Sequence, residues 1–166
     1  MAYQVRRLGA ADLDAYREIR LEALAAHPEA FGTTAEEEAA KPRERFLEAL
    51  EGNAVFGGFV AGRLVGIAGL RQEPKEKERH RGLLWGMYVA EAARGSGLAG
   101  ALVDAVLAEA RGRVLQVHLD VGDYNLAARR LYESRGFVSY GLAPRTLKVG
   151  ARYIDEHAMV CRLDDD

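Results

Sequence analysis

The chain has 166 residues, of which 49% are hydrophobic and 29% charged, and this composition is typical of a soluble globular protein with one domain over residues 1–166. Its net charge of -2 gives no electrostatic basis for nucleic-acid binding, and no segment reads as a membrane span or signal peptide. The single cysteine, Cys161, cannot form an internal disulfide. We therefore expect a cytoplasmic protein in which Cys161 is a small buried residue.

The first part of the chain is predicted to be mainly helical. A short strand at residues 5–8 precedes a helix whose apolar residues, among them Leu13 and Tyr16, repeat at helical spacing. This helix is expected to stop near His27 and Pro28, and residues 29–33 indicate a loop. Thr34 and Glu37 have the spacing of a capping box, and Pro42 suits the first turn of another helix. One strand and two or three helices are thus expected before residue 54.

The rest of the chain alternates strands with helices. Glycine-containing apolar runs at 54–60 and 64–70 predict an antiparallel hairpin, and residues 72–81 predict a charged loop. Further strands are expected at 83–89, 114–121, 137–140 and 153–163, and helices from Gly97 to about 111 and from 123 or 125 to 131. The strand–helix–strand unit around Gly97 should be a parallel crossover. The order therefore predicts a mixed sheet of the α/β (α+β) class.

A glycine-rich turn opens the helix after the strand at 83–89. Residues 95–100 match Gly-x-Gly-x-x-Gly, and Asp120 ends the next strand, as in a dinucleotide-binding fingerprint. Against a Rossmann domain, several residues separate the strand from Gly95, and too few follow Asp120 for a second nucleotide-binding half. Amides at a helix N-terminus favour a phosphate in either case, and Arg94 adds positive charge. A turn that merely starts a helix is the remaining alternative.

Taken from Arg94, the same turn is Arg-x-x-Gly-x-Ala, which resembles the acyl-CoA signature of the GNAT superfamily of N-acetyltransferases. The strand end before it and the run Asn-x-x-Ala-x-x-Leu-Tyr-Glu-x-x-Gly-Phe from Asn125 to Phe137 also resemble this superfamily. The resemblance implies the GNAT fold. That fold is a mixed, mostly antiparallel sheet of about six or seven strands, with a central parallel strand pair and about four helices.

The resemblance implies an acyltransferase that uses acetyl-CoA as co-substrate and no metal. It would move the acetyl group directly to a primary amine of a small molecule or peptide, in a ternary complex. The residues expected to bind CoA are Met87, Tyr88, Val89, Arg94, Gly95, Ser96, Gly97, Leu98 and Ala99. Asn125 contacts CoA, caps its helix, or does both. A non-catalytic acyl-CoA-binding or regulatory module is the alternative. Homodimers are common in the superfamily, but no sequence feature fixes an interface.

Two residues are candidates for proton transfer. Tyr132 lies two helical turns after Asn125 and matches the tyrosine that the superfamily places beside the CoA sulfur as general acid. Asp120 matches a glutamate proposed as base in ribosomal-protein N-terminal acetyltransferases, or it only organises the following turn. His118 on the same strand face and an ordered water are the other candidate bases. Gly86 predicts either a strand bulge or room for a large neighbour. The resemblance implies that such a bulge binds the pantetheine arm.

The acceptor site is expected between two segments that shape it in the superfamily, residues 28–34 and 142–153. Phe31 and Gly32 are the substrate-binding candidates in the first. The acidic residues Glu29, Glu36, Glu37 and Glu38 either favour a cationic amine or only face solvent. In the last strand, Asp155, Glu156 and His157 either line the acceptor pocket or are ordinary strand residues. The sequence does not identify the acceptor.

Overall fold

The computed structural model describes residues 1–164. Its strands are β1 (Gln4–Arg7), β2 (Ala54–Val60), β3 (Arg63–Gln72), β4 (Arg81–Val89), β5 (Gln116–Gly122), β6 (Val138–Val149) and β7 (Arg152–Arg162). Its α-helices are α1 (Leu13–Ala26), α2 (Ala35–Ala39), α3 (Arg43–Gly52), α4 (Leu98–Ala110) and α5 (Leu126–Ser134). The strands form one sheet in the order β1-β2-β3-β4-β5-β7-β6, in which β4 and β5 are the parallel pair. The predicted mixed sheet is confirmed, and the described residues form five α-helices where about four were expected.

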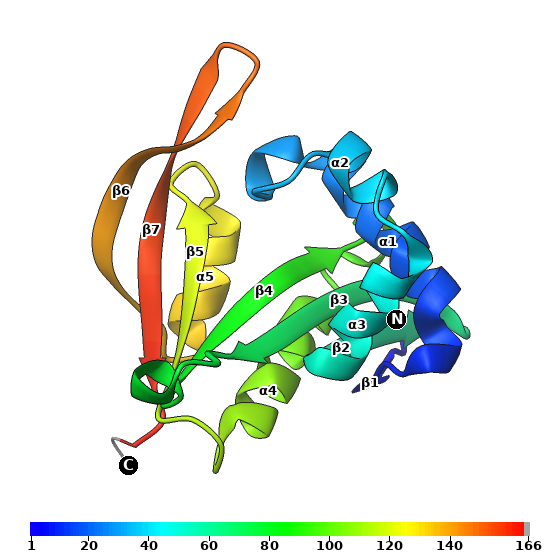
Figure 1. The fold of residues 1–166 in the computed structure, drawn as a ribbon, viewed down its shortest axis with the longest axis horizontal. Coiled ribbons are helices and arrows are strands. Elements are labelled where there is room, and N and C mark those ends of the chain that lie inside the picture. The colour runs from blue at the N-terminus through cyan, green and yellow to red at the C-terminus, as the bar shows by residue number, and fades with distance from the viewer. Residues whose placement is uncertain (165–166) are drawn as a thin grey trace.

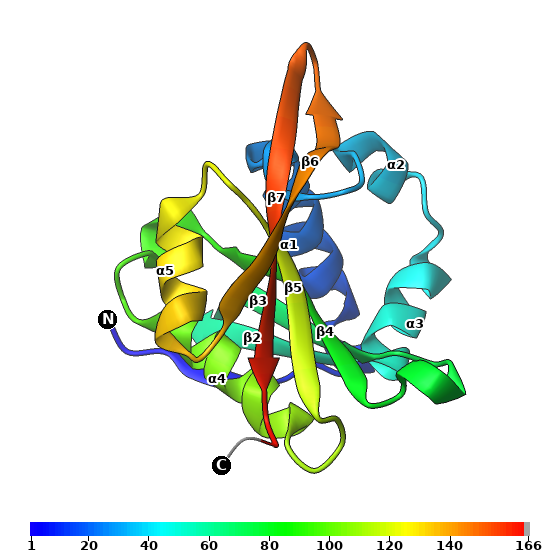
Figure 2. The ribbon, with the colours of Figure 1, turned by 90° about the vertical axis from the view of Figure 1, so that its left-hand side faces the viewer.

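Helices cover both faces of the sheet (Figures 1 and 2). On one face, α1 and α3 contribute buried residues such as Tyr16, Ile19 and Phe46 to a core with Val55 and Ile67 of the sheet. On the other face, α4 buries a second core, whose helical residues include Leu98, Leu102, Val103 and Val106. The site described below lies where these two layers meet the edges of β4 and β5.

Glycines in β2 and β3 allow the start of α4 to approach the sheet closely. Leu98, the first residue of α4, is 1% exposed. A Cβ built on Gly58 would lie 2.8 Å from the Cδ2 atom of Leu98, and a Cβ on Gly66 would lie 3.0 Å from the Cδ1 atom of Leu102. The N-terminus of α4 can therefore lie this close to the sheet only because Gly58 and Gly66 have no side chain.

The change Gly58→Ala is expected to lower the free energy of unfolding by about 1–3 kcal/mol, because Leu98 has no free volume into which it can move. Urea unfolding at constant m-value measures this loss. Gly52→Ala is the matched control, since a Cβ on Gly52 meets no heavy atom within 4 Å. Equal stability of the Gly58 and Gly52 variants would contradict the close packing of α4.

The parallel strands β4 and β5 pair only near their starts. The register joins Arg81 to Gln116, Gly82 to Val117 and Leu83 to His118. Beyond these pairs the two strands diverge, and the sheet opens between them (Figure 1). The second half of β4 and the end of β5 therefore present unpaired edges to each other.

A β-bulge interrupts β4 at Gly86. Ile67 of β3 pairs with Tyr88 and Gly69 pairs with Trp85, so two steps along β3 match three steps along β4. Gly86 has φ +66°, in the left-handed region where glycine is favoured. The bulge that the sequence suggested at this position is confirmed.

The final hairpin is longer than the sequence suggested. Strands were expected at 137–140 and 153–163, whereas β6 and β7 continue to the pair formed by Val149 and Arg152. The prediction missed this extension because β6 is exposed over most of its length and interrupted by Gly141 and Pro144. An exposed edge strand with a proline has no apolar alternation to reveal it. The tip extends beyond the rest of the sheet (Figure 2).

Candidate active site

The main cavity of the protein runs from the start of α4 to the β4 bulge. Its volume is about 680 Å³. The walls come from the segment after α1, the end of β4, the start of α4, and α5. They comprise His27, Glu29, Ala30, Phe31, Met87, Tyr88, Val89, Arg94, Gly95, Gly97, Ala99, Gly100, Tyr124, Asn125, Ala127, Ala128, Leu131, Tyr132 and Arg135. Segments far apart in the sequence thus form one elongated groove.

A smaller cavity of about 150 Å³ adjoins the first between β4 and β5. Trp85, Gly86 and Asp120 line it but not the main cavity. The two cavities have several walls in common, namely Ala30, Phe31, Met87, Tyr124, Asn125, Ala128 and Tyr132. The opening between β4 and β5 therefore connects the main cavity to the smaller one, and the bulge and Tyr132 lie at their junction.

The α4 N-terminus presents backbone donors to the main cavity. Gly95 and Gly97 have φ values of +76° and +90°, and Gly97 caps the helix without a side chain. The first hydrogen bond of the helix runs from Ala101 N to Gly97 O at 3.1 Å, so the amides of Ala99 and Gly100 precede the intrahelical series. These amides and the helix dipole favour an anion at this end of the groove.

Ser96 and Leu98 have structural roles at this turn. The Ser96 hydroxyl donates to Ala93 O at 2.6 Å and accepts from the Leu98 amide at 3.3 Å. The Leu98 side chain is buried against β2 and β3, and neither residue lines the main cavity. The sequence predicted that all residues of this turn bind CoA. In the structure some of them line the groove, whereas Ser96 and Leu98 stabilise the conformation of the turn.

Two arginines lie at this end of the groove. Arg94 donates from Nε to Val89 O at 3.2 Å, and its Nη2 lies 2.7 Å from Nε2 of His27. Arg135 of the turn after α5 pairs with Asp104 at 3.2 Å and packs against Gly100, where a Cβ would collide with its guanidinium. Both cations line the main cavity beside the α4 N-terminus, and the sequence indicated only Arg94.

Asn125 and Tyr132 lie on one face of α5, as their spacing predicted. The Asn125 side chain accepts from the Ala128 amide at 3.2 Å, so Asn125 caps the helix. Tyr132 is 6% exposed, and its ring packs edge-on against Phe137 at 5.8 Å. Burial raises the pKa of the Tyr132 phenol above its ordinary value. The hydroxyl therefore keeps its proton at neutral pH at the junction of the two cavities.

Alkaline pH is expected to destabilise the protein mainly through Tyr16, Tyr88 and Tyr132. Burial raises the pKa of Tyr16 and Tyr88 to about 12 and raises that of Tyr132 as well, whereas all three titrate near 10 when unfolded. Below pH about 10 their contribution to stability is fully present. Above it the unfolded state loses these protons first, so the free energy of unfolding falls by about 4 kcal/mol per pH unit until the folded groups ionise.

Urea unfolding from pH 9 to pH 11 measures this slope. Tyr16→Phe removes one of the three protons and should reduce the slope by about a third, while Tyr153→Phe at an exposed position serves as control. Slopes that are equal in the wild type and in Tyr16→Phe would show that Tyr16 titrates normally in the folded state.

The candidate bases differ in their surroundings. Asp120 is exposed and lines the smaller cavity together with Gly86 and Tyr132. His118 lines neither cavity of the site; its Nε2 lies 2.6 Å from the Gln116 amide nitrogen and its Nδ1 3.2 Å from the Tyr140 hydroxyl. Burial, and secondarily Arg81, lower the pKa of His118. Of these two side chains, only Asp120 faces the site.

The segment after α1 and the hairpin tip enclose a third cavity of about 600 Å³. Phe31, Gly32 and Thr33 line it on one side and Leu147 and Lys148 on the other. Phe31 lines all three cavities, so this third space is continuous with the site at that ring. Gly32 lines only this outer space. The two segments named from the sequence do face each other.

The acidic residues named from the sequence do not form one negative surface. Glu29 lines the main cavity, and Glu36 and Glu37 are exposed, with Glu37 closing the capping box of α2. Glu38 is buried and pairs with Arg20 and Lys41. Its charge is therefore compensated, and the reading of Glu38 as solvent-facing is wrong.

Residues of the last strand support the hairpin instead of lining these cavities. Asp155 accepts from the Arg145 amide and Glu156 from the Thr146 hydroxyl. His157 lies 2.9 Å from the Ser139 hydroxyl and 2.6 Å from Asp123, but none of these three lines any of the three cavities. Cys161 is buried, as expected, and burial raises the pKa of its thiol.

The structure brings most of the predicted site residues to the two connected cavities. Sequence reasoning missed Gly100, Tyr124, Ala128, Leu131 and Arg135. A signal existed for Ala128 and Leu131, since both belong to the motif from Asn125 and share its helical face. Tyr124 and Arg135 lie at the two ends of α5 and carry no periodic pattern, so only the tertiary packing places them in the groove.

A family model described as the Acetyltransferase (GNAT) family matches residues 13–137, which include the α4 turn and the α5 motif. The chain belongs to this family. A search of curated proteins gives no match. The GNAT fold is also found in solved structures that cover nearly all of the chain.

An acetyltransferase of the GNAT family from Streptococcus pneumoniae has a TM-score of 0.88 at 19% identity, covering 98% of this chain and 100% of its own. The structure of yncA from Salmonella typhimurium with its cofactor acetyl-CoA has a TM-score of 0.86 at 23% identity, covering 100% and 96%. The ribosomal-protein-alanine N-acetyltransferase from Brucella melitensis has a TM-score of 0.78 at 26% identity, covering 96% and 99%.

The main cavity has helix N-terminal amides and two arginines at one end, and an apolar wall of Ala128, Leu131 and Met87 toward the bulge. No group of three or more metal-ligating side chains occurs among residues 1–164. No helix within these residues is long and apolar enough to cross a membrane.

Proposed function

We propose that this GNAT protein transfers the acetyl group of acetyl-CoA directly to a primary amine of a small molecule or peptide. The observation that carries the proposal is the junction of the two cavities, where the β4 bulge and the protonated Tyr132 form common walls. A thioester held in the main cavity would meet an amine arriving through the smaller one. The likeness to a ribosomal-protein-alanine N-acetyltransferase supports an amine acceptor.

The chain holds the CoA ester at both ends in this proposal. The amides of Ala99 and Gly100 donate to the pyrophosphate, and Arg94 and Arg135 balance its charge. Gly95 and Gly97 permit the close approach of the backbone. Met87, Tyr88 and Val89 donate and accept along the pantetheine arm, and the amides freed by the bulge polarise the thioester carbonyl. Asn125 lines the same arm while it caps α5.

Tyr132 supplies the proton that the departing thiolate needs. The amine nitrogen attacks the thioester carbon, the carbon–sulfur bond breaks, and the Tyr132 hydroxyl donates its proton to the sulfur. The proton lost by the amine restores the phenol through solvent or Asp120. The raised pKa of Tyr132 keeps the donor protonated until the sulfur develops charge. Direct transfer is supported because Cys161, the one thiol of the chain, is buried elsewhere.

Asp120 is the proposed base for the amine. If it removes the ammonium proton directly, Asp120→Asn should lower kcat/KM about a hundredfold at pH 7 and less at pH 9, where more of the amine is already neutral. A pH–rate profile with several acceptors measures this. A profile of Asp120→Asn that parallels the wild type would assign the step to a water molecule.

A thiol-release assay with acetyl-CoA tests the function. The panel contains amino acids, polyamines, aminoglycosides and peptides with free N-termini, and mass spectrometry confirms the acetylated product. Release of one CoA per acetylated amine is the expected result. Stabilisation of the protein by acetyl-CoA without turnover on the panel would favour the alternative, a binding or regulatory module. The buried phenol at the junction favours the enzyme, because a binding module has no use for a proton donor.

A further inference from the structure

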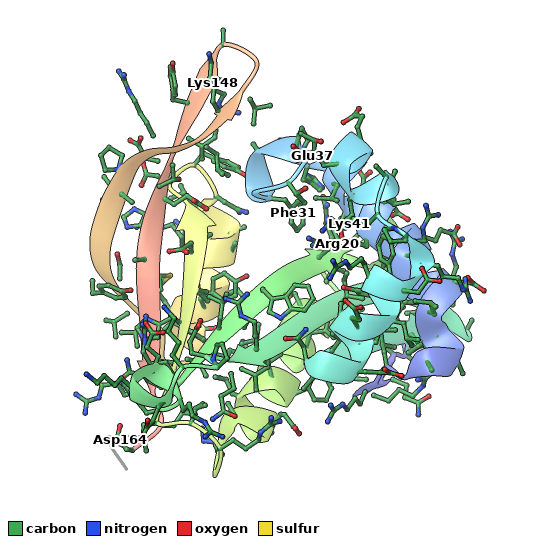
Figure 3. All side chains as sticks on the ribbon, in the orientation of Figure 1. Arg20, Phe31, Glu37, Lys41, Lys148 and Asp164 are labelled. Carbon is green, nitrogen blue, oxygen red and sulfur yellow. The ribbon has the colours of Figure 1, made fainter. Side chains whose placement is uncertain are left out.

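A fourth cavity lies behind the reaction centre, between α1, the α2–α3 region and β4. Its volume is about 390 Å³, and its polar lining comprises Tyr16, Arg20, Glu38, Lys41, Arg45 and Trp85. Trp85 also lines the smaller cavity of the site and so forms the wall between the two. Arg20, Phe31 and Lys41 lie close together on the side of the helices that faces β4 (Figure 3).

Two nitrogen atoms of this wall are buried without a hydrogen-bond acceptor. They are Nη1 of Arg20 and Nε1 of Trp85, two of the three such side-chain atoms among the described residues. Guanidinium and indole N–H groups can only donate. A buried donor with no acceptor carries an energetic cost, which a ligand oxygen at this position would remove. The chemistry of the wall therefore calls for an acceptor group.

The charges of the cluster also favour an anion. Arg20 donates from Nε to Glu38 at 3.3 Å, and Lys41 pairs with the other oxygen of Glu38 at 2.8 Å. One carboxylate thus faces two cations, and only 12% of the Arg20 side chain is exposed. Arg45, at the rim of the cavity, pairs with Glu48 at the surface. The positive charge of the largely buried Arg20 is therefore left without a full counterion.

Arg20 lies directly beside the bulge. A Cβ built on Gly86 would lie 3.5 Å from Nη1 of Arg20, so this nitrogen packs against the backbone next to Met87. The guanidinium lies 5.3 Å from the centre of the Phe31 ring and 5.8 Å from that of Trp85. Both rings line the smaller cavity. The unpartnered nitrogen is thus only one residue away from the proposed position of the thioester.

We propose that the acceptor carries an anionic group close to its amine, a carboxylate or a phosphorus oxyacid, and that Arg20 and Trp85 bind this group. The proposal rests on the proposed acetyl transfer and names its substrate class: amino acids and their phosphonate analogues, in place of simple amines or polyamines. Because both nitrogens are buried, Phe31 moves off the guanidinium when the acceptor enters. The amine then lies on the Met87 side of the bulge and the anion on the Arg20 side.

Matched acceptors test the proposal. Each L-amino acid is assayed beside its carboxamide and its decarboxylated amine, and aminoalkylphosphonates are included. The wild type is expected to prefer the acid over its amide by at least about tenfold in kcat/KM, with the amine nitrogen adjusted to equal protonation. Amides and decarboxylated amines that react as well as the acids would overturn the proposal and leave the acetyltransferase function intact.

Three variants test whether Arg20 and Trp85 cause the preference for acids. Arg20→Gln combined with Glu38→Gln keeps a neutral pair in place of the ion pair and should abolish the preference for acids. Trp85→Phe keeps an aromatic ring without the N–H and should reduce the preference several-fold, while Arg20→Lys should retain part of it. Arg63→Gln, at the exposed start of β3, is the control. A full preference for acids in the Arg20 variants would overturn the assignment.

A binding measurement separates this proposal from the proposed function. Thermal stabilisation of the protein with CoA is recorded with each acid and each amide. If no acceptor turns over but acids stabilise the wild type and not the Arg20→Gln/Glu38→Gln variant, the anion site stands and the transfer reaction does not. If acids stabilise neither protein and show no advantage in turnover, the anion site is refuted. Circular dichroism verifies the fold of each variant.

Discussion

Replacing Tyr132 by phenylalanine is expected to lower kcat by about a hundredfold to ten-thousandfold, while the affinity for CoA stays within about twofold. The change removes only the hydroxyl at the junction of the two cavities and keeps the ring that packs on Phe137. The thiolate must then leave without a positioned proton. Thiol release under saturating acetyl-CoA measures kcat, and calorimetry measures CoA binding.

The unchanged binding is what identifies the role. A structural role for Tyr132 would lower stability and CoA affinity together, whereas a proton donor acts on turnover alone. A comparison of acceptor amines tests the same role. The loss of kcat in Tyr132→Phe should be similar for every amine, because the proton goes to the CoA sulfur and not to the acceptor. Wild-type turnover in Tyr132→Phe would exclude the general-acid role.

Replacing Ala99 by aspartate is expected to affect folding and binding in opposite directions. Ala99 is the second residue of α4 and lines the main cavity. A carboxylate in the first turn stabilises a helix by about 0.3–1 kcal/mol through the helix dipole. In the same place it repels the pyrophosphate, and like-charge contacts cost several kcal/mol, so CoA affinity should fall by about a hundredfold or more.

Ala99→Asn is the matched control, because asparagine has nearly the shape of aspartate without its charge. It should reduce CoA affinity far less than the aspartate. Calorimetry with CoA and with pantetheine, which has no phosphate, separates the phosphate end from the rest of the ligand. Pantetheine should bind both variants with equal affinity. Equal CoA affinity of the Asp and Asn variants would move the phosphate site away from the α4 N-terminus.

Much of the fold follows from local patterns. The hairpin of β2 and β3, the α4 helix and the cap of α5 by Asn125 are each visible in short stretches, because helix periodicity, capping and tight turns are local properties. The long β6 strand was missed for the opposite reason. It pairs with β7 on one edge only and is exposed, so nothing in its own residues distinguishes it from a loop.

The residues of the site divide in the same way. The turn from Arg94 to Ala99 indicates an anion site from local sequence alone, because backbone amides at a helix start suffice for it. The resemblance of this turn and of the Asn125–Phe137 motif to the GNAT superfamily is what implied CoA. Within that turn, however, only packing decided that Ser96 accepts a hydrogen bond from the Leu98 amide while Gly97 and Ala99 face the groove. Glu38 gave no local sign of its burial beside Arg20.

The sequence by itself thus determined the family of the protein and indicated the turn where we propose that the nucleotide part of CoA binds. Only the tertiary structure revealed the residues at the proposed acceptor end. Arg20, Phe31 and Trp85 come from a helix, a loop and a strand that are distant in the chain, and they meet because β4 bulges at Gly86 and separates from β5. Contacts between distant segments depend on how the helices pack on the sheet, and local sequence patterns do not predict them.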